Sequence, residues 1–311
     1  MKSPYVGDAL SGVYHSMAED IELGDAEREA CELLAQAEWH LGEEEIDTCL
    51  RKARQALESF RQSGYEEGIA DSARLAMMAL LNDEKHDEAN DIAKLELPRF
   101  QKSGYQTGEA KMLLCLADIE CRSKGLKAGA QAVRFGERAR KLFKIHKDRK
   151  MEVAALLAVA NAHLMTGKSK QKAAQEALAT ATAAREICKE LRDKRGEAEC
   201  LHILALGHAF LESFADCFRC EDEALDLYLE LQDKRMEAFE CLSIANLRCQ
   251  AGQYRRALSD AEDALEIFQL LKSPREALAL SEMYTALLAE GDVGAARRLL
   301  KRGLERFQDS G

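Results

Sequence analysis

The stretch "IANLRCQAGQYRRALSDAEDALEIF" (residues 244–268) contains two apolar patterns with helical spacing, separated by a short turn. The turn is "AGQY" (251–254), and its glycine is typical of a chain reversal. After it, small or apolar residues recur every three or four positions: Ala257, Leu258, Ala261, Ala264, Leu265 and Phe268. Each segment has one apolar face, which an isolated pair of helices cannot bury. The stretch therefore predicts a helix–turn–helix unit that stacks on similar neighbours.

Two nearly identical phrases give the period of this unit. "DKRGEA" occupies residues 193–198, and "DKRMEA" occupies residues 233–238. Equivalent anchor positions recur along the chain at Glu29, Ile69, Glu109, Glu152, Glu197, Glu237 and Glu276. Neighbouring anchors are about 40 residues apart, a period typical of stacked helical repeats. They define seven units, which start near residues 25, 65, 105, 148, 193, 233 and 273. We expect these units to fill residues 25–311, after a flexible or weakly structured segment over residues 1–24.

Three positions of each unit are occupied mainly by small side chains. In the sixth unit they are Ala245 on the first helical segment and Ala257 and Ala264 on the second. At the equivalent positions of all seven units, only Met77, Glu96 and Tyr284 are not Ala, Cys or Gly. Antiparallel helices approach closely only where side chains are small. Each unit is therefore predicted to be a tightly packed pair, made of a first helix and a second helix.

Residues 244–268 closely resemble a tetratricopeptide repeat. The resemblance rests on the small-residue and turn positions Ala245, Gly252, Tyr254, Ala257 and Ala264. The usual repeat has about 34 residues, whereas this one is longer, similar to the repeats of spindle-orientation and G-protein-modulator scaffolds. The resemblance implies an all-α, right-handed superhelical solenoid of about seven stacked repeats. It also implies that the first helices line a concave wall.

Some units depart from the common pattern. Pro98 lies inside the second helix of the second unit, where we expect a bent or shortened helix. The third and fourth units are longer than the second. The sequence places the additional residues between the two helices of each unit, near "KGLKAGAQ" (124–131) and "GKSKQKAA" (167–174).

Composition sets the class of protein. The chain has only 3 prolines and 6% aromatic residues, which favours helices. No apolar run reaches the roughly 20 residues of a membrane-spanning helix. The 10 cysteines come without a recognisable secretion signal, so we expect reduced thiols and a cytoplasmic location.

The net charge of −11 is unevenly distributed. Residues 18–47 are strongly acidic, and residues 122–150 are strongly basic. The basic segment could be a solvated face, a contact for an acidic protein partner, or a nucleic-acid surface. Phe135, Leu142 and Phe143 fall on the expected buried side, which leaves no aromatic stacking surface and disfavours nucleic acid.

Motifs that carry chemistry are missing from the sequence. It has no phosphate-binding GxxxxGK[ST] loop, no GxSxG elbow and no HExxH, so we expect no enzyme activity and no cofactor. "CFRC" (217–220) has CxxC spacing, but Cys217 occupies a small packing position. His40, His163 and His208 recur at one repeat position, which would separate them along the solenoid. The sequence therefore predicts no metal site.

The repeated phrase itself has a local explanation. Asp193 and Asp233 stand just before amphipathic helices, where a carboxylate caps free backbone N–H groups. In the seventh unit, Ser273 to Glu276 fits a capping box with Pro274 at the first helical position.

The predicted function is a non-enzymatic scaffold or adaptor that binds a peptide or helical protein segment on the concave face. Carried over by repeat position, the exposed polar candidates on the first helices are Arg74, Asn82, Lys111, Asp118, Arg122, Asn161, His202, Asn246 and Gln250. One alternative is an architectural subunit or self-association, through residues 18–47 and the basic last helix, which carries Arg297, Arg298, Lys301, Arg302 and Arg306. Another is the sensor region of a longer protein.

Overall fold

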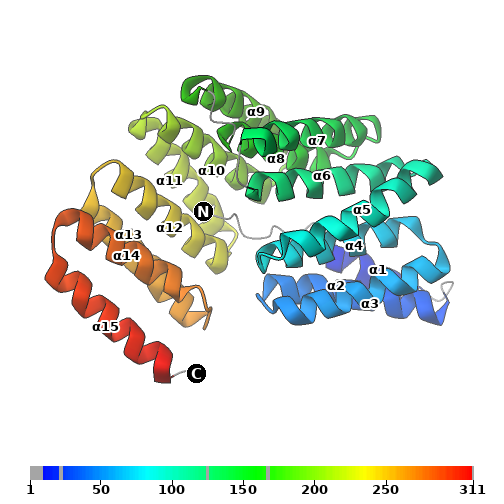
Figure 1. The fold of residues 1–311 in the computed structure, drawn as a ribbon, viewed down its shortest axis with the longest axis horizontal. Helices are drawn as coiled ribbons and strands as arrows, with labels where there is room; N and C mark the ends of the chain where they lie inside the picture. Colours follow the sequence, from blue (N-terminus) through cyan, green and yellow to red (C-terminus); the bar gives the residue numbers. More distant parts are fainter. Residues whose placement is uncertain (1–9, 21–23, 124–125, 166–168, 310–311) are drawn as a thin grey trace. The chain divides into compact units, whose positions relative to one another are not determined.

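The computed structural model describes residues 10–20, 24–123, 126–165 and 169–309, which form 15 α-helices and no strand (Figure 1). The helices are α1 (Leu10–Ala18), α2 (Asp25–Gly42), α3 (Ile46–Ser63), α4 (Glu66–Asn82), α5 (His86–Ser103), α6 (Gln106–Arg122), α7 (Leu126–Ile145), α8 (Arg149–Met165), α9 (Lys170–Leu191), α10 (Lys194–Phe210), α11 (Phe214–Glu230), α12 (Lys234–Gln250), α13 (Tyr254–Leu270), α14 (Glu276–Glu290) and α15 (Val293–Asp309). Among the described residues, none of these helices has the length and apolar character needed to cross a membrane.

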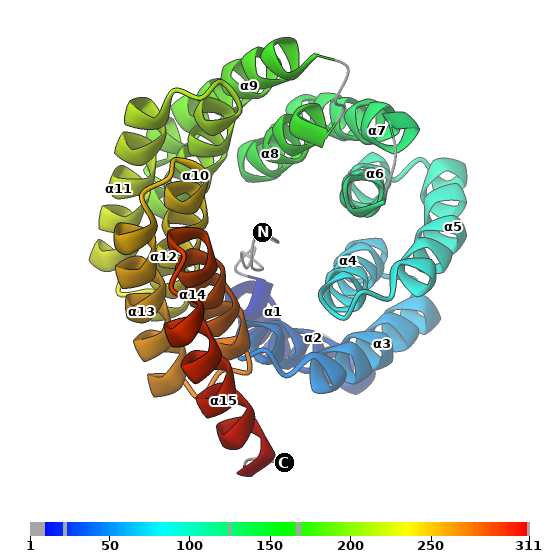
Figure 2. The ribbon, with the colours of Figure 1, turned by 60° about the vertical axis from the view of Figure 1, so that its left-hand side comes forward.

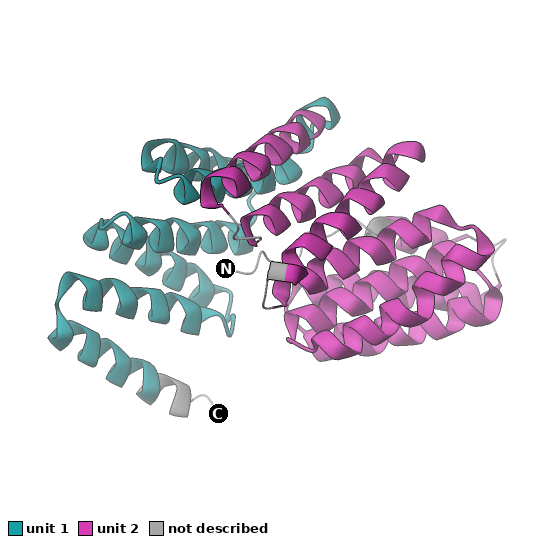
Figure 3. Ribbon diagram, turned by 45° about the horizontal axis from the view of Figure 1, so that its top comes forward, with its two compact units in different colours: residues 1–4, 188–311 teal, residues 5–187 magenta. Residues whose placement is uncertain are grey.

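The chain divides into two compact units, each of which contains several of the helix-pair repeats; Figure 3 colours the two units separately. Unit 2 contains Tyr5–Ile187, and unit 1 contains Cys188–Gly311. The boundary falls inside α9, near its C-terminal end. The repeats that the sequence places in one continuous array therefore belong to two groups.

Within each unit, consecutive helices pack as pairs (Figures 1 and 2). In unit 2, the first helices α2, α4, α6 and α8 also contact one another in order, and thus form a layer. The second helices α3, α5 and α7 each pack against the first helix that follows. In unit 1, α10 pairs with α11 and α12 with α13, while α12 also contacts the next first helix, α14. The prediction of an all-α protein made of stacked helix pairs is confirmed.

The small residues are buried among the packed helices. Fifteen Ala and Cys residues at the three small-residue positions are 0% exposed: Ala37, Cys49, Ala56, Ala89, Ala117, Ala132, Ala139, Ala160, Ala177, Ala184, Ala205, Cys217, Ala224, Ala257 and Ala264. Glu96 occupies one of these positions and is also 0% exposed. Arg61 of the preceding second helix donates from Nε to Oε1 of Glu96 at 2.9 Å, which compensates the buried charge.

The two long repeats extend their second helices. α7 and α9 have 20 and 22 residues, whereas α3 has 18 and α11 has 17. The first small position is close to the start of α3, at Cys49, but it lies further into α7 and α9, at Ala132 and Ala177. The additional residues thus form about one more helical turn at the start of each second helix. The expected insertion between the helices is largely absorbed into regular structure.

Pro98 does not shorten its helix. α5 runs over 18 residues, the same length as α3, and Pro98 lies inside it. Of the two expected effects, shortening does not occur, because proline removes one hydrogen bond while the flanking residues stay anchored; a bend at Pro98 stays a prediction. Ala93 and Phe100, on either side of Pro98, are 1% and 0% exposed.

The N-terminal segment contains a helix that the sequence pattern missed. α1 lies within residues 1–24, which were expected to be flexible or weakly structured, and it packs against α2. Tyr14 anchors it: its side chain is 2% exposed, and its ring centroid lies 6.1 Å from that of Phe60 on α3. Residues 1–9 lie outside the described part of the chain.

A second repeated phrase, Ser-Gly-Tyr-x-x-Gly, occurs at residues 63–68 and 103–108. In the first copy, Gly64 ends α3 with a φ of 77°, a left-handed conformation that favours glycine. Gly68 allows the start of α4 to approach the core, since a Cβ atom there would lie 2.6 Å from the Phe60 ring. Helix ends and close helix approach are thus encoded together.

The predicted N-caps of α10 and α12 are confirmed. Asp193 accepts a hydrogen bond from the backbone N–H of Gly196 at 3.0 Å, and Asp233 accepts one from Met236 at 3.1 Å. The predicted capping box is wrong, because α14 begins at Glu276, after Pro274, and Ser273 Oγ instead accepts from the N–H of Arg275 at 3.2 Å.

Replacing Asp193 by Ala is expected to cost about 1 kcal/mol of stability through the lost cap. Asp233→Ala is expected to cost slightly more, since Asp233 also accepts from Arg195 Nη2 at 2.9 Å across a partly exposed ion pair. Urea unfolding of both variants measures the loss in the free energy of unfolding. Asp193→Asn keeps a side-chain acceptor and is the control, expected to match the wild type. Equal midpoints for Asp193→Ala and Asp193→Asn would contradict the capping role.

Candidate functional site

All nine partner-binding candidates lie on first helices. Arg74 and Asn82 are on α4; Lys111, Asp118 and Arg122 on α6; Asn161 on α8; His202 on α10; Asn246 and Gln250 on α12. Gln250 is exposed, and six others are half-buried. Arg74 and Lys111 are only 5% and 6% exposed, so the expectation that they are exposed is wrong. The physical reason is that α4 and α6 are enclosed, with residues 68–77 and 108–115 buried without interruption.

Lys111 takes part in a buried contact that joins three helices. Its Nζ forms an ion pair with Oδ1 of Asp71 on α4, and Tyr14 of α1 donates its hydroxyl to Asp71 Oδ2 at 2.8 Å. Burial raises the pKa of Asp71, while the Lys111 charge opposes that shift. Burial, together with Asp71, raises the pKa of Tyr14, so its hydroxyl stays protonated and acts as a donor. Sequence reasoning missed Tyr14 and Asp71, because neither belongs to a repeated polar position.

A second group lies where α4 and α6 end. Arg122 donates from Nη1 to the backbone carbonyl of Leu81 at 3.0 Å, which ties the two first helices together. Asp118 lies one turn before Arg122, and burial raises its pKa to about 6, although the charges of Arg122 and Arg74 oppose the shift. Three of the predicted residues, Arg74, Asp118 and Arg122, are thus close enough for the two Arg charges to affect the pKa of the Asp118 carboxyl group.

In unit 1 the predicted amides form a short chain of hydrogen bonds. Asn246 donates from Nδ2 to Oε1 of Glu282 on α14 at 2.6 Å, and Gln250 donates from Nε2 to Asn246 Oδ1 at 2.8 Å. Of these two amides, Gln250 is the exposed one. They therefore link two neighbouring first helices and present one polar group outward.

His202 meets two buried glutamates that the sequence pattern did not single out. Its Nδ1 lies 3.2 Å from Oε2 of Glu240 on α12 and 3.7 Å from Oε1 of Glu221 on α11. Burial and the neighbouring Glu240 carboxylate raise the pKa of Glu221 well above its usual value. A glutamate one helical turn after a small packing position, as Glu221 is after Cys217, is a signal that could have indicated a buried carboxyl group.

The other histidines and the CxxC pair have separate surroundings. His40 Nδ1 lies 2.8 Å from Glu45 Oε2, and His163 Nδ1 lies 3.1 Å from Glu176 Oε2. Cys217 is 0% exposed, and burial raises the pKa of its thiol to about 12. A thiol held in its protonated form is a packing group, as the sequence predicted.

The basic segment 122–150 is partly neutralised by neighbouring acids. Arg138 on α7 pairs with Glu109 of α6, and Arg149 Nη1 lies 2.8 Å from Glu152 Oε2. Phe143 is 0% exposed, and Phe135 and Leu142 pack against the same core, as expected for the buried side of α7.

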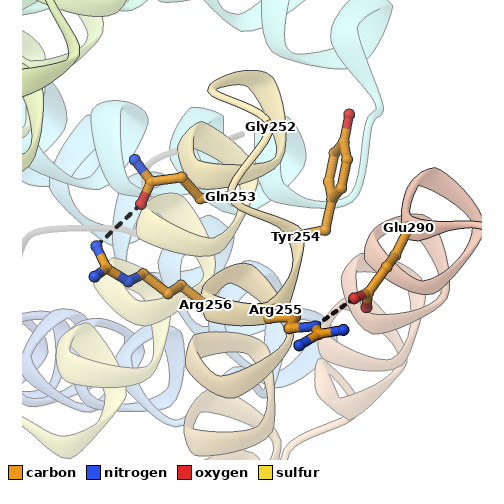
Figure 4. A pocket seen from close by; sticks show the side chains of 6 residues that line it. All are labelled: Gly252, Gln253, Tyr254, Arg255, Arg256 and Glu290. Atoms are coloured by element: carbon orange, nitrogen blue, oxygen red, sulfur yellow. Dashed lines mark hydrogen bonds and ion pairs between the residues drawn. The ribbon is translucent and has the colours of Figure 1, made fainter.

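A hollow of about 380 Å³ lies at the turn before α13 (Figure 4). It is lined by Gly252, Gln253, Tyr254, Arg255, Arg256 and Glu290. Arg255 donates from Nε to Glu290 Oε1 at 2.6 Å, and Arg256 donates to Gln253 Oε1 at 3.4 Å. Because its polar groups bond to one another, this hollow has little to offer a ligand.

No protein-family model and no curated protein matches this sequence. Solved structures do match it over most of its length. One is a signal-transduction ATPase with numerous domains (STAND) that has a tetratricopeptide repeat sensor, from Pyrococcus horikoshii. Its TM-score is 0.63 at 14% identity, and the match covers 97% of this chain and 47% of that one. This chain thus spans about half the length of the STAND protein.

Two Rap proteins are also similar. A Rap protein complexed with competence and sporulation factor has a TM-score of 0.61 at 15% identity, over 88% of this chain and 76% of that chain. The apo form of RapI has a TM-score of 0.58 at 13% identity, and the match covers 94% of this chain and 90% of that chain. At these identities the likeness concerns the fold alone, which is a tetratricopeptide-like helical repeat fold.

Tyr14→Phe is expected to lower stability by about 1.5–3 kcal/mol, because it removes a donor from a buried carboxylate. Urea unfolding and hydrogen exchange of α1 and α4 measure the effect. Tyr65→Phe is the matched control, since Tyr65 donates its hydroxyl to Glu67 Oε2 at 3.1 Å in an exposed bond. Equal midpoints for the two variants would mean that the Tyr14–Asp71 bond does not hold α1.

Asp118 is expected to make stability depend on pH. Its pKa of about 6 in the folded protein lies above its ordinary value, so the folded state binds the proton more tightly than the unfolded state. The stability that protonated Asp118 contributes to the folded protein is thus present at low pH and is lost as pH rises from about 4 to about 6. The free energy of unfolding of Asp118→Asn relative to the wild type should therefore increase as pH rises through this range, by up to about 3 kcal/mol for a shift of about two pKa units. A difference in urea midpoint that does not change between pH 4 and pH 7 would refute the assignment.

Proposed function

We propose that this protein is a non-enzymatic interaction scaffold that holds a protein segment against its first helices. The observation that carries the proposal is the layer of first helices, in which successive repeats present half-buried polar side chains at matching positions. Such a surface suits an extended or helical peptide, because regularly spaced donors and acceptors meet regularly spaced groups. We expect this role in the cytoplasm.

The comparisons favour the same class of function. A Rap protein with this fold has been solved in a complex with competence and sporulation factor. For this chain, the residues best suited to a partner are those that are accessible and not enclosed between helices. Asn82, Asn161 and Gln250 fit this description, whereas Arg74 and Lys111 do not.

The test begins with affinity capture from the native extract and identification of the bound protein by mass spectrometry. Its affinity is then measured for Gln250→Arg on α12 and Asn161→Arg on α8. We expect each change to weaken binding at least about 10-fold, equal to about 1.4 kcal/mol, because a bulky charge blocks the surface.

The matched controls carry the same changes on second helices. Gln131→Arg on α7 replaces another exposed glutamine, and Asn90→Arg on α5 replaces another half-buried asparagine. Both should bind as the wild type does. If all four variants bind the captured protein equally, or if the second-helix variants are the weaker ones, binding by the first helices is ruled out.

A second candidate is the sensor region of a longer protein. It is favoured by the match to the STAND protein with a tetratricopeptide repeat sensor, which covers 97% of this chain but 47% of that one. In that role, the same first helices would bind an effector. Binding would shift the conformational equilibrium of a neighbouring domain, because the two are coupled.

A further inference from the structure

Three consecutive helices of unit 1 place a histidine and two glutamates together. His202 comes from α10, Glu221 from α11 and Glu240 from α12. One ligand atom of each residue lies within 4.8 Å of the ligand atoms of the other two. The side chains of Glu221 and Glu240 are 0% and 3% exposed, and that of His202 is 16% exposed. The group is therefore almost enclosed, with the imidazole at its accessible side.

The hydrogen bonds around this group are incomplete. Ser243 donates its hydroxyl to Glu221 Oε1 at 3.3 Å. Glu221 Oε2, Glu240 Oε1 and His202 Nδ1 are buried atoms with no hydrogen-bond partner among the described residues. A buried acceptor without a partner costs free energy, and each of these three side chains contributes such an atom to the same small space. Two facing carboxylates also repel each other unless a cation or a proton lies between them.

We propose that His202, Glu221 and Glu240 bind a divalent transition-metal ion of the zinc class. One imidazole nitrogen and two carboxylate oxygens are ligands that such ions take, and imidazole selects against magnesium and calcium. Bond lengths of zinc to these atoms imply ligand–ligand separations of about 3.3–3.6 Å in a tetrahedral site. The 3.2 Å and 3.7 Å separations from His202 Nδ1 to the two glutamates are close to that spacing.

The ion would act as a tie between repeats. α10 and α11 belong to the fifth repeat and α12 to the sixth, so one ion joins both helices of one pair to the next. Ser243, one turn after Glu240, would orient the Glu221 carboxylate from outside the ligand shell. Three protein ligands leave a fourth position open, on the side where His202 is accessible. The proposed metal site does not depend on the proposed peptide-binding function, and its test gives the same answer whether or not a peptide binds.

The full chain is stripped of metal with EDTA, dialysed, and titrated with Zn²⁺ by calorimetry and with Co²⁺ by visible absorption. We expect one ion per chain, a raised melting temperature, and a Co²⁺ spectrum of nitrogen and oxygen ligands without a thiolate charge-transfer band. Glu240→Gln, Glu221→Gln and His202→Gln should each weaken Zn²⁺ binding at least about 10-fold. The two Glu→Gln variants should fold at least as well as the metal-free wild type, since they remove a buried charge.

His163→Ala is the matched control, because His163 also lies next to a glutamate, Glu176, but belongs to no such three-residue group in the part of the chain that the structure describes. It should keep the Zn²⁺ affinity and the rise in melting temperature. The proposal is overturned if the wild type binds no Zn²⁺, or if all three ligand variants bind it as the wild type does. A Co²⁺ spectrum dominated by thiolate bands would also overturn it, since the ion would then be held by cysteines. If no ion binds, a proton shared between Glu221 and Glu240 accounts for the group instead.

Discussion

Close contact between small side chains is the constraint on which this structure depends. Residues such as Ala37, Cys49 and Ala56 are 0% exposed, and their equivalents recur in the following repeats. A protein interior is packed about as densely as an organic crystal, so a larger side chain at such a point would push two helices apart. Because small residues recur at most of these positions, the same kind of close contact can form in successive helix pairs. Stacking of such pairs then follows, since each leaves an apolar face uncovered.

The same packing determines what the polar residues of the first helices can do. A first helix is flanked by its own partner and by helices of adjacent repeats, so a polar side chain on it is often enclosed. Enclosed polar groups must find partners within the protein. Lys111 pairs with Asp71, Arg122 donates to the Leu81 carbonyl, and Asn246 donates to Glu282. Each of these contacts joins first helices of adjacent repeats. The polar residues thus fix the position of one repeat on the next before any partner is bound.

Sequence reasoning succeeded where the cause is local. Asp193 and Asp233 could be identified as N-caps because a cap depends on residues within one turn of the helix. It failed where the cause is distant. Nothing near Lys111 in the sequence indicates that Asp71 and Tyr14 enclose it. α1 was missed because it has no copy elsewhere in the chain, and a method based on periodicity detects only what recurs.

By itself, the sequence determined the helix pairs, their period, the small contact positions and the helix starts at Asp193 and Asp233. These features follow from spacing along the chain, and the chain repeats them. The tertiary structure alone decided which polar side chains meet. His202, Glu221 and Glu240 lie on three different helices, and their spacing along the chain does not indicate that the three side chains meet. They come together only when the three helices pack, because packing brings residues that are distant in the sequence into one enclosed space.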